Sequence, residues 1–343
     1  MKVLGIETSC DDTSLCIIDY TPDEQVNILS HISFSGEILL RKWGGIVPEI
    51  AARNHLAKLA PLMKEAFEQA SVSPKEIELI GVTTYPGLLG PLLTGLNAAK
   101  TISLLHKTPI VGVNHLFAHL EAIHLTEKIN YPYLGLIVSG GHTLFLKVNS
   151  PTEIKVISST VDDAAGEAFD KGGKLMGLGY PAGALIDQLA RKGNPKKYSF
   201  PIGLDDARNP NLSFSGLKTS LRVFLENNPS IKSDSPEIAD LCASYQEAIV
   251  SALKKKAKVA MNLVKDDLPL VVGGGVACNS RLRMIFQQNF SQVHFVAPKF
   301  CTDNGAMIAH YGLLIKDQAI SFPECLNLDA KSRFIDKKDF ISR

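Results

Sequence analysis

Two apolar runs separated by a short polar turn occur twice along the chain. Each arrangement predicts two strands joined by a turn that presents hydroxyl groups, carboxylates or glycine backbone. Because the arrangement recurs, we interpret it as an internal duplication in which one copy opens each of two similar lobes. The strands are expected at residues 3–7 and 15–20, around the turn TSCDDTS (8–14), and at residues 133–138 and 144–148, around the turn SGGHT (139–143).

Helix and strand patterns alternate in the rest of the chain. Such alternation is typical of an α/β protein. We expect a loop within residues 44–55 that leads into a helix ending at about residue 70, and further helices in residues 92–106 and 238–264. Strands are expected at 79–84, 110–113, 270–272 and 293–296.

The segment NHLFAHLE (114–121) predicts a helix that carries two histidines. Asn114 is a favourable N-cap, and an apolar stripe follows on one face. In a helix His115 and His119 lie one turn apart, so their imidazoles can bind one metal ion, with a third ligand from elsewhere. The same spacing also fits polar surface histidines or hydrogen-bonded core histidines.

Composition narrows the class of protein. The 343 residues favour two domains, and 45% hydrophobic with 21% charged residues is typical of a globular chain. A net charge of +1 excludes a globally basic nucleic-acid binder but allows a local basic face. The six cysteines form no C-x-x-C pair, and the N-terminal apolar run is too short for a signal peptide. We therefore expect a cytoplasmic protein.

Three other features carry candidate chemistry. Asp11 and Asp12 either position a reacting group or metal, or accept hydrogen bonds from turn amides. The strand at 270–272 runs into a glycine turn and a helix, which favours an anion site but matches no nucleotide fingerprint. Asp303 stands at the start of the last helix, as a ligand or as an N-cap.

Seven motifs taken together resemble one family. They cover essentially the whole chain, and their order resembles that of the TsaD (formerly Gcp) family of tRNA N6-adenosine threonylcarbamoyltransferases. The motifs are ETSCDDT (7–13), NHLFAHL (114–120), VSGGHT (138–143), DDAAGEAFDK (162–171), SFSGLKT (213–219), GGGVACN (273–279) and CTDNGAM (301–307).

The resemblance implies an α/β fold of the ASKHA (actin, sugar kinase and Hsp70) type, with two duplicated lobes around a nucleotide cleft. We expect residues 1–113 plus 306–343 to form the first lobe, and residues 114–305 to form the second, with the metal and nucleotide sites. The implied reaction transfers threonylcarbamoyl from threonylcarbamoyl-AMP to N6 of the adenosine 3′ of the anticodon in tRNAs that read ANN codons. ATP or ADP is expected to fit the same cleft.

The resemblance also implies roles for individual residues. The metal, Fe²⁺ or Zn²⁺, would be held by His115, His119 and Asp303. We suggest Asp11, Asp12 and His142 at the reacting centre, where one of them takes a proton from the attacking amine. The residues expected to hold the adenylate are Ile137, Val138, Ser139, Gly140, Gly141, Asp170, Gly183, Asp187 and Asn279.

Partners are implied as well. The family acts on tRNA with a paralogous subunit of the same fold and a small ATPase. Basic segments 254–258 and 191–197 are candidate tRNA surfaces. Some positions depart from the family pattern. Asp12 replaces a frequent Glu, Tyr85 replaces a Gly before Pro-Gly, and Gly172-Gly173 follow Asp170-Lys171 where D-K-x-A is more common.

Rival functions remain at this stage. One is a metalloprotease, an older interpretation of the family, but Leu116 stands where zincin proteases carry their general base. A second is a non-catalytic ATP-binding scaffold subunit of the same fold, but the bacterial paralogue that has this role lacks the histidine pair. A third is a carbamoyltransferase that acts on small-molecule hydroxyls or protein thiols, but such enzymes are generally longer chains.

Overall fold

The structure, a computed structural model, describes residues 1–333 apart from 22, 24, 37–42, 44, 205, 207 and 266. The chain divides into two units. Met1–Lys128 and the described residues from Thr302 onward form the first unit, and Ile129–Cys301 form the second. Residues 334–343, the end of the predicted first lobe, lie outside the described residues.

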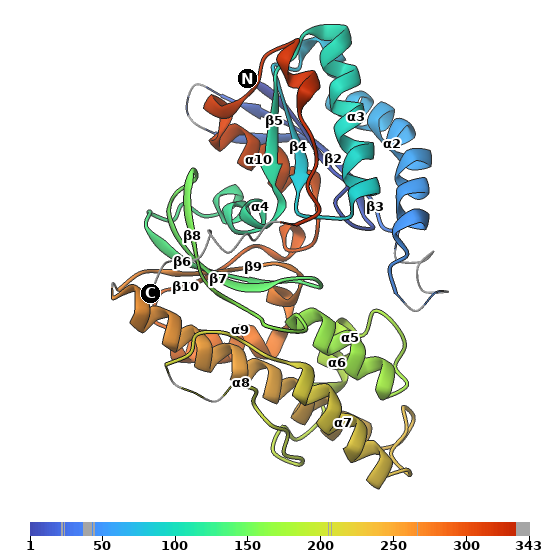
Figure 1. Ribbon diagram of the computed structural model, residues 1–343, viewed down its shortest axis with the longest axis vertical. Coiled ribbons are helices and arrows are strands. Elements are labelled where there is room, and N and C mark those ends of the chain that lie inside the picture. Colours follow the sequence, from blue (N-terminus) through green and yellow to red (C-terminus); the bar gives the residue numbers. More distant parts are fainter. Residues whose placement is uncertain are drawn as a thin grey trace. The chain divides into compact units, whose positions relative to one another are not determined.

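The first unit is built on a five-stranded sheet of order β3-β2-β1-β4-β5. β1 is antiparallel to β2 and parallel to β4. Figure 1 shows α2 and α3 on one side of this sheet and α10 on the other. Its elements are β1 (Lys2–Glu7), β2 (Thr13–Tyr20), β3 (Val26–Phe34), α2 (Pro48–Ala70), β4 (Leu79–Tyr85), α3 (Leu89–His106), β5 (Ile110–Asn114), α4 (His115–Glu121) and α10 (Gly305–Leu314).

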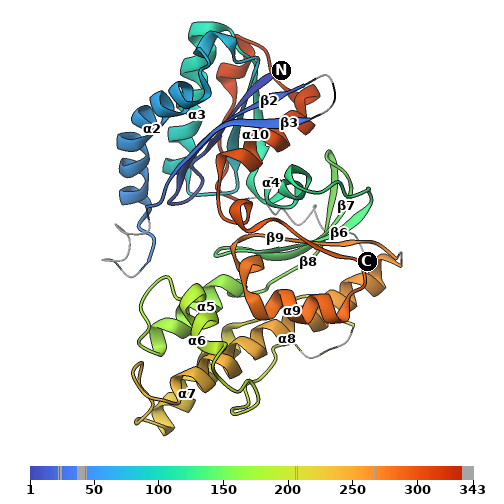
Figure 2. The same ribbon diagram turned by 180° about the vertical axis from the view of Figure 1, so that it is seen from behind.

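The second unit repeats this topology. Its sheet has the order β10-β9-β6-β7-β8, so β6 takes the central place of β1 with the same antiparallel and parallel neighbours. Figure 2 shows the long α8 with α9 beside it against this sheet. Its elements are β6 (Tyr133–Val138), β7 (Thr143–Ser150), β8 (Glu153–Ser159), α5 (Ala165–Leu175), α6 (Gly183–Ala190), α7 (Ser215–Asn227), α8 (Ile238–Val264), β9 (Leu270–Gly273), α9 (Ser280–Asn289) and β10 (Val293–Phe295). The predicted duplication is confirmed.

Glycine lets α10 lie directly on the first sheet. A Cβ atom at Gly5 of β1 would stand 2.3 Å from the carbonyl oxygen of Gly305, the first residue of α10. No side chain larger than hydrogen fits this contact, so the start of α10 is fixed against the central strand. Asp303, two residues earlier, is thereby placed near the carboxyl end of β1.

The boundary between the units differs from the predicted division at 113/114 and 305/306. The segment 114–128, with α4 and the short helix after it, belongs to the first unit because both pack on α10. Leu116, Leu120 and Ile123 are fully buried there. The candidate metal ligands therefore all lie in the first unit, where we had expected them in the second.

One residue of the candidate tRNA surface at 254–258 is buried and holds a loop in place. Lys256 in α8 is only 1% exposed and donates hydrogen bonds to the backbone carbonyls of Asp206 and Asn209. It anchors a loop and is not exposed on the surface.

None of the helices in the described part of the chain combines the length and the apolar composition that a membrane span requires.

Candidate metal centre and nucleotide loops

The two histidines stand at the start of α4, directly after β5. Asn114 ends the strand, and its side-chain oxygen accepts hydrogen bonds from the backbone N–H groups of Leu116 and Phe117. This N-cap fixes where the helix begins, so His115 occupies its first turn and His119 lies one turn later. Both rings are buried, at 6% and 0% exposure.

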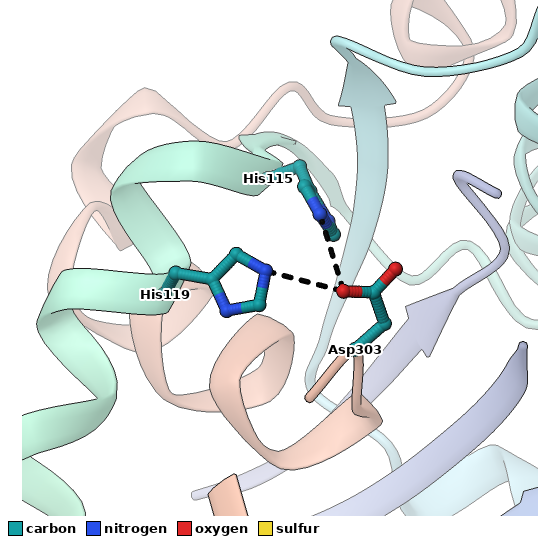
Figure 3. A group of neighbouring side chains, drawn as sticks. All are labelled: His115, His119 and Asp303. Carbon is teal, nitrogen blue, oxygen red and sulfur yellow. Dashed lines mark hydrogen bonds and ion pairs between the residues drawn. The ribbon is translucent and has the colours of Figure 1, made fainter. Parts of the chain in front are cut away.

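Asp303 meets both histidine rings with a single carboxylate oxygen. Its Oδ1 lies 3.5 Å from Nε2 of His115 and 3.2 Å from Nε2 of His119. Figure 3 shows the two rings projecting from one helix toward this oxygen. Asp303 is not the cap of α10, because the Asn304 side chain accepts the hydrogen bond from the N–H group of Met307.

The donor set fits a small divalent ion. The ligand atoms of His115, His119 and Asp303 all lie within 4.8 Å of one another. Ligands held about 2.0–2.1 Å from a tetrahedral ion are separated by about 3.3 Å, close to the nitrogen–oxygen distances of 3.5 and 3.2 Å in this cluster. Two imidazoles and a carboxylate also suit both zinc and iron.

Glu7 is a member of this site that sequence reasoning missed. It ends β1, has 0% exposure, and its Oε2 lies 3.0 Å from Nδ1 of His115. The side chain of Thr83 donates a hydrogen bond of 2.6 Å to the same oxygen. Its signals in the sequence were its place as the first residue of the motif ETSCDDT (7–13) and its position at the end of a mainly apolar strand.

Charge and burial act against each other at this site. Burial lowers the pKa of His115, but the negative charges of Asp303 and Glu7 outweigh it and raise that pKa to about 9. Burial would raise the pKa of Glu7, yet the charge and hydrogen bond of His115 hold it below its usual value. Burial dominates at His119, whose pKa is lowered. The cluster therefore stabilises positive charge at the position facing Asp303.

The predicted catalytic acids lie in the first unit too. Oδ1 of Asp12 is buried and has no hydrogen-bond partner among the residues that the structure describes. Burial, followed by the charges of Asp303 and Asp11, raises the pKa of Asp12 to about 7. His55 of α2 holds this turn, with its ring nitrogens 2.7 Å from Oγ1 of Thr13 and 3.0 Å from the carbonyl oxygen of Cys10. His142, the third predicted catalytic residue, belongs to the second unit.

The predicted adenylate loops converge in the second unit. Ile137 and Val138 have buried side chains, so only their backbone groups can contact a ligand. The N–H group of Ser139 donates a hydrogen bond to the carbonyl oxygen of His142, and this bond closes the turn. A Cβ atom at Gly140 or Gly141 would meet no atom within 4 Å, so the backbone there borders open space.

Two further glycines pack against this turn. A Cβ atom at Gly166, at the start of α5, would lie 2.6 Å from the carbonyl oxygen of Ser139. Gly274 has φ +93°, a conformation that disfavours side chains, and its Cβ would lie 2.5 Å from the carbonyl oxygen of Val138. Close backbone approach of this kind is typical of anion-binding turns.

The polar residues predicted to hold the adenylate make contacts within the protein. Asp170 accepts a hydrogen bond from the N–H group of Ala182, which leads into Gly183 at the start of α6. Asp187 accepts hydrogen bonds from the hydroxyl of Ser280 and from Arg191. These contacts hold Asp187 against the start of α9 at Ser280, and its role in holding the adenylate stays a prediction.

Asn279 likewise has structural contacts on both sides of its amide. Its oxygen caps α9 through the N–H group of Leu282, and its nitrogen donates to Gln246. A hollow of about 510 Å³ lies beside these residues, lined by Arg191, Gln246, Ser280 and Met284 among others. This volume is in the range of small-molecule sites.

Comparison with solved structures shows the type of fold. HypF in a phosphate- and nucleotide-bound form matches 92% of this chain and 46% of its own, with TM-score 0.58 and 13% identity. The Acidaminococcus fermentans (R)-2-hydroxyglutaryl-CoA dehydratase component A matches 92% of this chain and 99% of its own, with TM-score 0.55 and 14% identity. At such identities the likeness shows the fold alone, and it confirms the predicted ASKHA architecture.

Sequence comparison then places the chain within one family. Residues 27–310 match the model of the TsaD family, tRNA N6-adenosine threonylcarbamoyltransferase. A protein of that description from Thermotoga neapolitana is 44% identical over 335 residues, covering 96% of this chain and 98% of its own. One from Trichlorobacter lovleyi is 44% identical over 317 residues, covering 91% of each chain. The chain belongs to the TsaD family and is a transferase, as predicted, and the comparisons do not favour the rival functions.

Proposed function

We propose that this chain transfers a threonylcarbamoyl group from threonylcarbamoyl-AMP to N6 of the adenosine next to the anticodon, on its 3′ side, in tRNAs that read ANN codons. The observation that carries the proposal is the cluster of His115, His119 and Asp303 in a chain that matches the family over residues 27–310. A reaction of this kind forms the new C–N bond as the amine attacks the carbamoyl carbon, and it releases AMP as the C–O bond breaks.

His115, His119 and Asp303 would hold one divalent ion, Fe²⁺ or Zn²⁺. Such an ion supplies Lewis acidity, which stabilises negative charge on a phosphoryl or carbonyl oxygen. The proposal is supported by the short separations of the ligand atoms and by the negative charge that Asp303 and Glu7 place there.

The adenylate would bind in the second unit. A Cβ atom at Gly140, Gly141 or Gly275 would meet no atom within 4 Å, so the backbone of these turns leaves room for its phosphate. The hollow beside Gln246 and Ser280 suits its nucleoside, and ATP or ADP would use the same residues. Asp170, Asp187 and Asn279 would then act mainly by holding these loops in place.

Asp12 is the best candidate for the group that accepts the amine proton. Burial, the largest cause of its raised pKa, makes the Asp12 carboxylate a better proton acceptor for the attacking amine than an exposed aspartate. Its free oxygen is also not committed to any other hydrogen bond among the described residues. Asp11 and His142 remain secondary candidates.

We further propose that the chain works in the cytoplasm with a paralogous subunit of the same fold and a small ATPase.

Tyr85, which departs from the family pattern, lies at the end of β4 in the first unit. The effect of this tyrosine is best tested by exchange for glycine within the assembled complex.

The test is a reconstituted reaction. The purified chain, its partners, threonine, bicarbonate, ATP and an ANN-decoding tRNA are incubated, and the modified nucleoside is measured by mass spectrometry. We expect product with the wild type and at least a hundredfold less with His115→Ala/His119→Ala. The exposed His106 provides a matched control, since His106→Ala removes an imidazole elsewhere in the same unit. Unchanged product in the double variant would refute the assignment of catalysis to this site.

A further inference from the structure

Glu7 occupies a place where a buried carboxylate needs a specific explanation. It ends the central strand of the first sheet and is inaccessible to solvent. Removing a carboxylate from water costs several kcal/mol unless donors satisfy it. An apolar residue at this position would extend the core without that cost. The groups that surround Glu7 therefore indicate which interaction requires its negative charge.

Three donors converge on this carboxylate. The N–H group of Ser9 donates to Oε1 at 2.5 Å, and the hydroxyl of Thr83 donates to Oε2 at 2.6 Å. The third group is Nδ1 of His115, 3.0 Å from Oε2, and it donates there when Nδ1 carries the proton and Glu7 is ionised. Thr83 therefore fixes the same oxygen that faces the imidazole, and the direction of the carboxylate is set from two sides.

The sheet explains why these residues meet. β1, β4 and β5 are parallel neighbours, so their carboxyl ends lie at one edge. Glu7 ends β1, Thr83 lies near the end of β4, and His115 directly follows β5. The contact between Glu7 and His115 thus depends on strand pairing across more than a hundred residues of sequence.

The two histidines are not held alike. Nδ1 of His115 faces Glu7 and also lies 3.2 Å from the hydroxyl of Ser9. Nδ1 of His119 is buried and has no hydrogen-bond partner among the described residues. Only His115 has its outer nitrogen fixed by a carboxylate.

We propose that Glu7 is a positioning residue for the metal site: it holds His115 in the Nδ1–H tautomer and directs the lone pair of Nε2 toward the ion. The inference rests on the proposed metal site and adds Glu7 and Thr83 to it. A carboxylate that accepts the outer N–H of a histidine ligand fixes the ring and raises its basicity, and loss of such a partner typically weakens metal binding by 10–100-fold.

The test measures zinc binding rather than catalysis. Dissociation constants are obtained by competition with a chromophoric chelator for the wild type, Glu7→Gln and Thr83→Val. We expect Glu7→Gln, which keeps the shape but not the charge, to bind zinc 10–100-fold more weakly. Thr83→Val, which leaves Glu7 in place but frees one side of it, should show a smaller loss.

A matched control is provided by a second buried glutamate in the same unit. Glu121 is also 0% exposed and lies 3.6 Å from Nε2 of His124, which is not one of the proposed ligands. Glu121→Gln removes a buried carboxylate beside a histidine, but its dissociation constant for zinc should stay within threefold of the wild-type value. Equal weakening in Glu121→Gln and Glu7→Gln would show a general loss of packing and overturn the proposal.

A second measurement needs no substitution. In zinc-loaded wild type with ¹⁵N-labelled histidine, long-range ¹H–¹⁵N spectra report which nitrogen of His115 carries the proton. We expect the proton on Nδ1, and a proton on Nε2 would overturn the inference. Zinc binding that is equally tight in Glu7→Gln and wild type would refute the role of Glu7 alone, whereas no zinc binding by the wild type would refute the metal site itself.

Discussion

Asn304, and not Asp303, caps α10, and this difference of one residue leaves the Asp303 carboxylate available to two histidines. The sequence could not decide between capping and ligation, because both aspartate and asparagine are good caps. The decision depends on α4 packing against α10, a contact between segments almost two hundred residues apart.

Cys278 is a second residue whose chemistry depends on a distant neighbour. A hydrogen bond with the thiol of Cys301, helped by the charge of Arg283, outweighs burial and lowers the pKa of Cys278 to about 7. Cys278 is exposed, whereas Cys16 and Cys242 are buried and their pKa values are raised. Thiolate, the reactive form, is therefore concentrated at Cys278 near neutral pH.

We predict that iodoacetamide modifies Cys278 well before Cys16 or Cys242, with a rate that rises to half its maximum near pH 7. Peptide mapping by mass spectrometry across pH 5–9 measures the profile. In Cys301→Ala the hydrogen bond is lost, so the midpoint should move above pH 8. A wild-type midpoint near the ordinary thiol value of about 8.5 would contradict the prediction.

At the scale of helices and strands, local sequence was informative where the signal lies within one element. The N-cap at Asn114, the long α8 and the strands around both polar turns were predicted from periodicity and capping alone. The side-chain contacts of Asp187 and Lys256 were not, because their partners come from other elements. Periodicity identifies which face of a helix is buried, but it does not identify the hydrogen-bond partners of the polar side chains on that helix.

Helix α10 carries a buried histidine with a consequence for stability. Both ring nitrogens of His310 are buried without a hydrogen-bond partner among the described residues. Burial, with a smaller contribution from His124, lowers the pKa of His310 from 6.5 to about 3. Below pH 6.5 the unfolded chain therefore takes up a proton that the folded helix excludes, and stability falls as the pH falls from about 6.5 toward 3.

We predict that this residue alone reduces the free energy of unfolding of the wild type by about 1.4 kcal/mol between pH 7.5 and pH 5.5. His310→Phe should lack this loss, since it keeps an aromatic ring in a site without polar partners. Denaturant unfolding at both pH values measures the difference, and the exposed His106→Phe is the control. If the free energy of unfolding depends on pH in the same way in His310→Phe and in wild type, folding does not lower the pKa of His310 and the prediction is wrong.

At the scale of the whole molecule, the two units repeat one topology but differ in the chemistry of the turn after the central strand. In the first unit this turn carries Asp11 and Asp12, and in the second it carries Gly140 and Gly141. Duplication was visible in the sequence because the turns keep their place in the pattern. The assignment of α4 to the first unit was not, since it depends on packing against α10.

The residues proposed to hold the metal and those proposed to hold the adenylate therefore belong to different units. We predict that the two proposed sites can be disabled separately. Gly140→Val places a side chain in open space, so folding should be preserved while ADP binding weakens at least tenfold. Asp303→Asn removes a charged ligand from the first unit, and should reduce zinc binding without changing ADP affinity in zinc-free buffer.

Calorimetric titration of each variant with ADP and with zinc decides between separate and shared sites. Gly216, where a Cβ atom also meets no atom within 4 Å, gives the matched control Gly216→Val in another part of the second unit. Because the zinc ligands and Glu7 come from the first unit alone, zinc affinity in Gly140→Val should stay within twofold of wild type. A parallel loss of zinc and ADP in that variant would mean that the glycine turn supports both sites, and the division of chemistry between the duplicated units would be wrong.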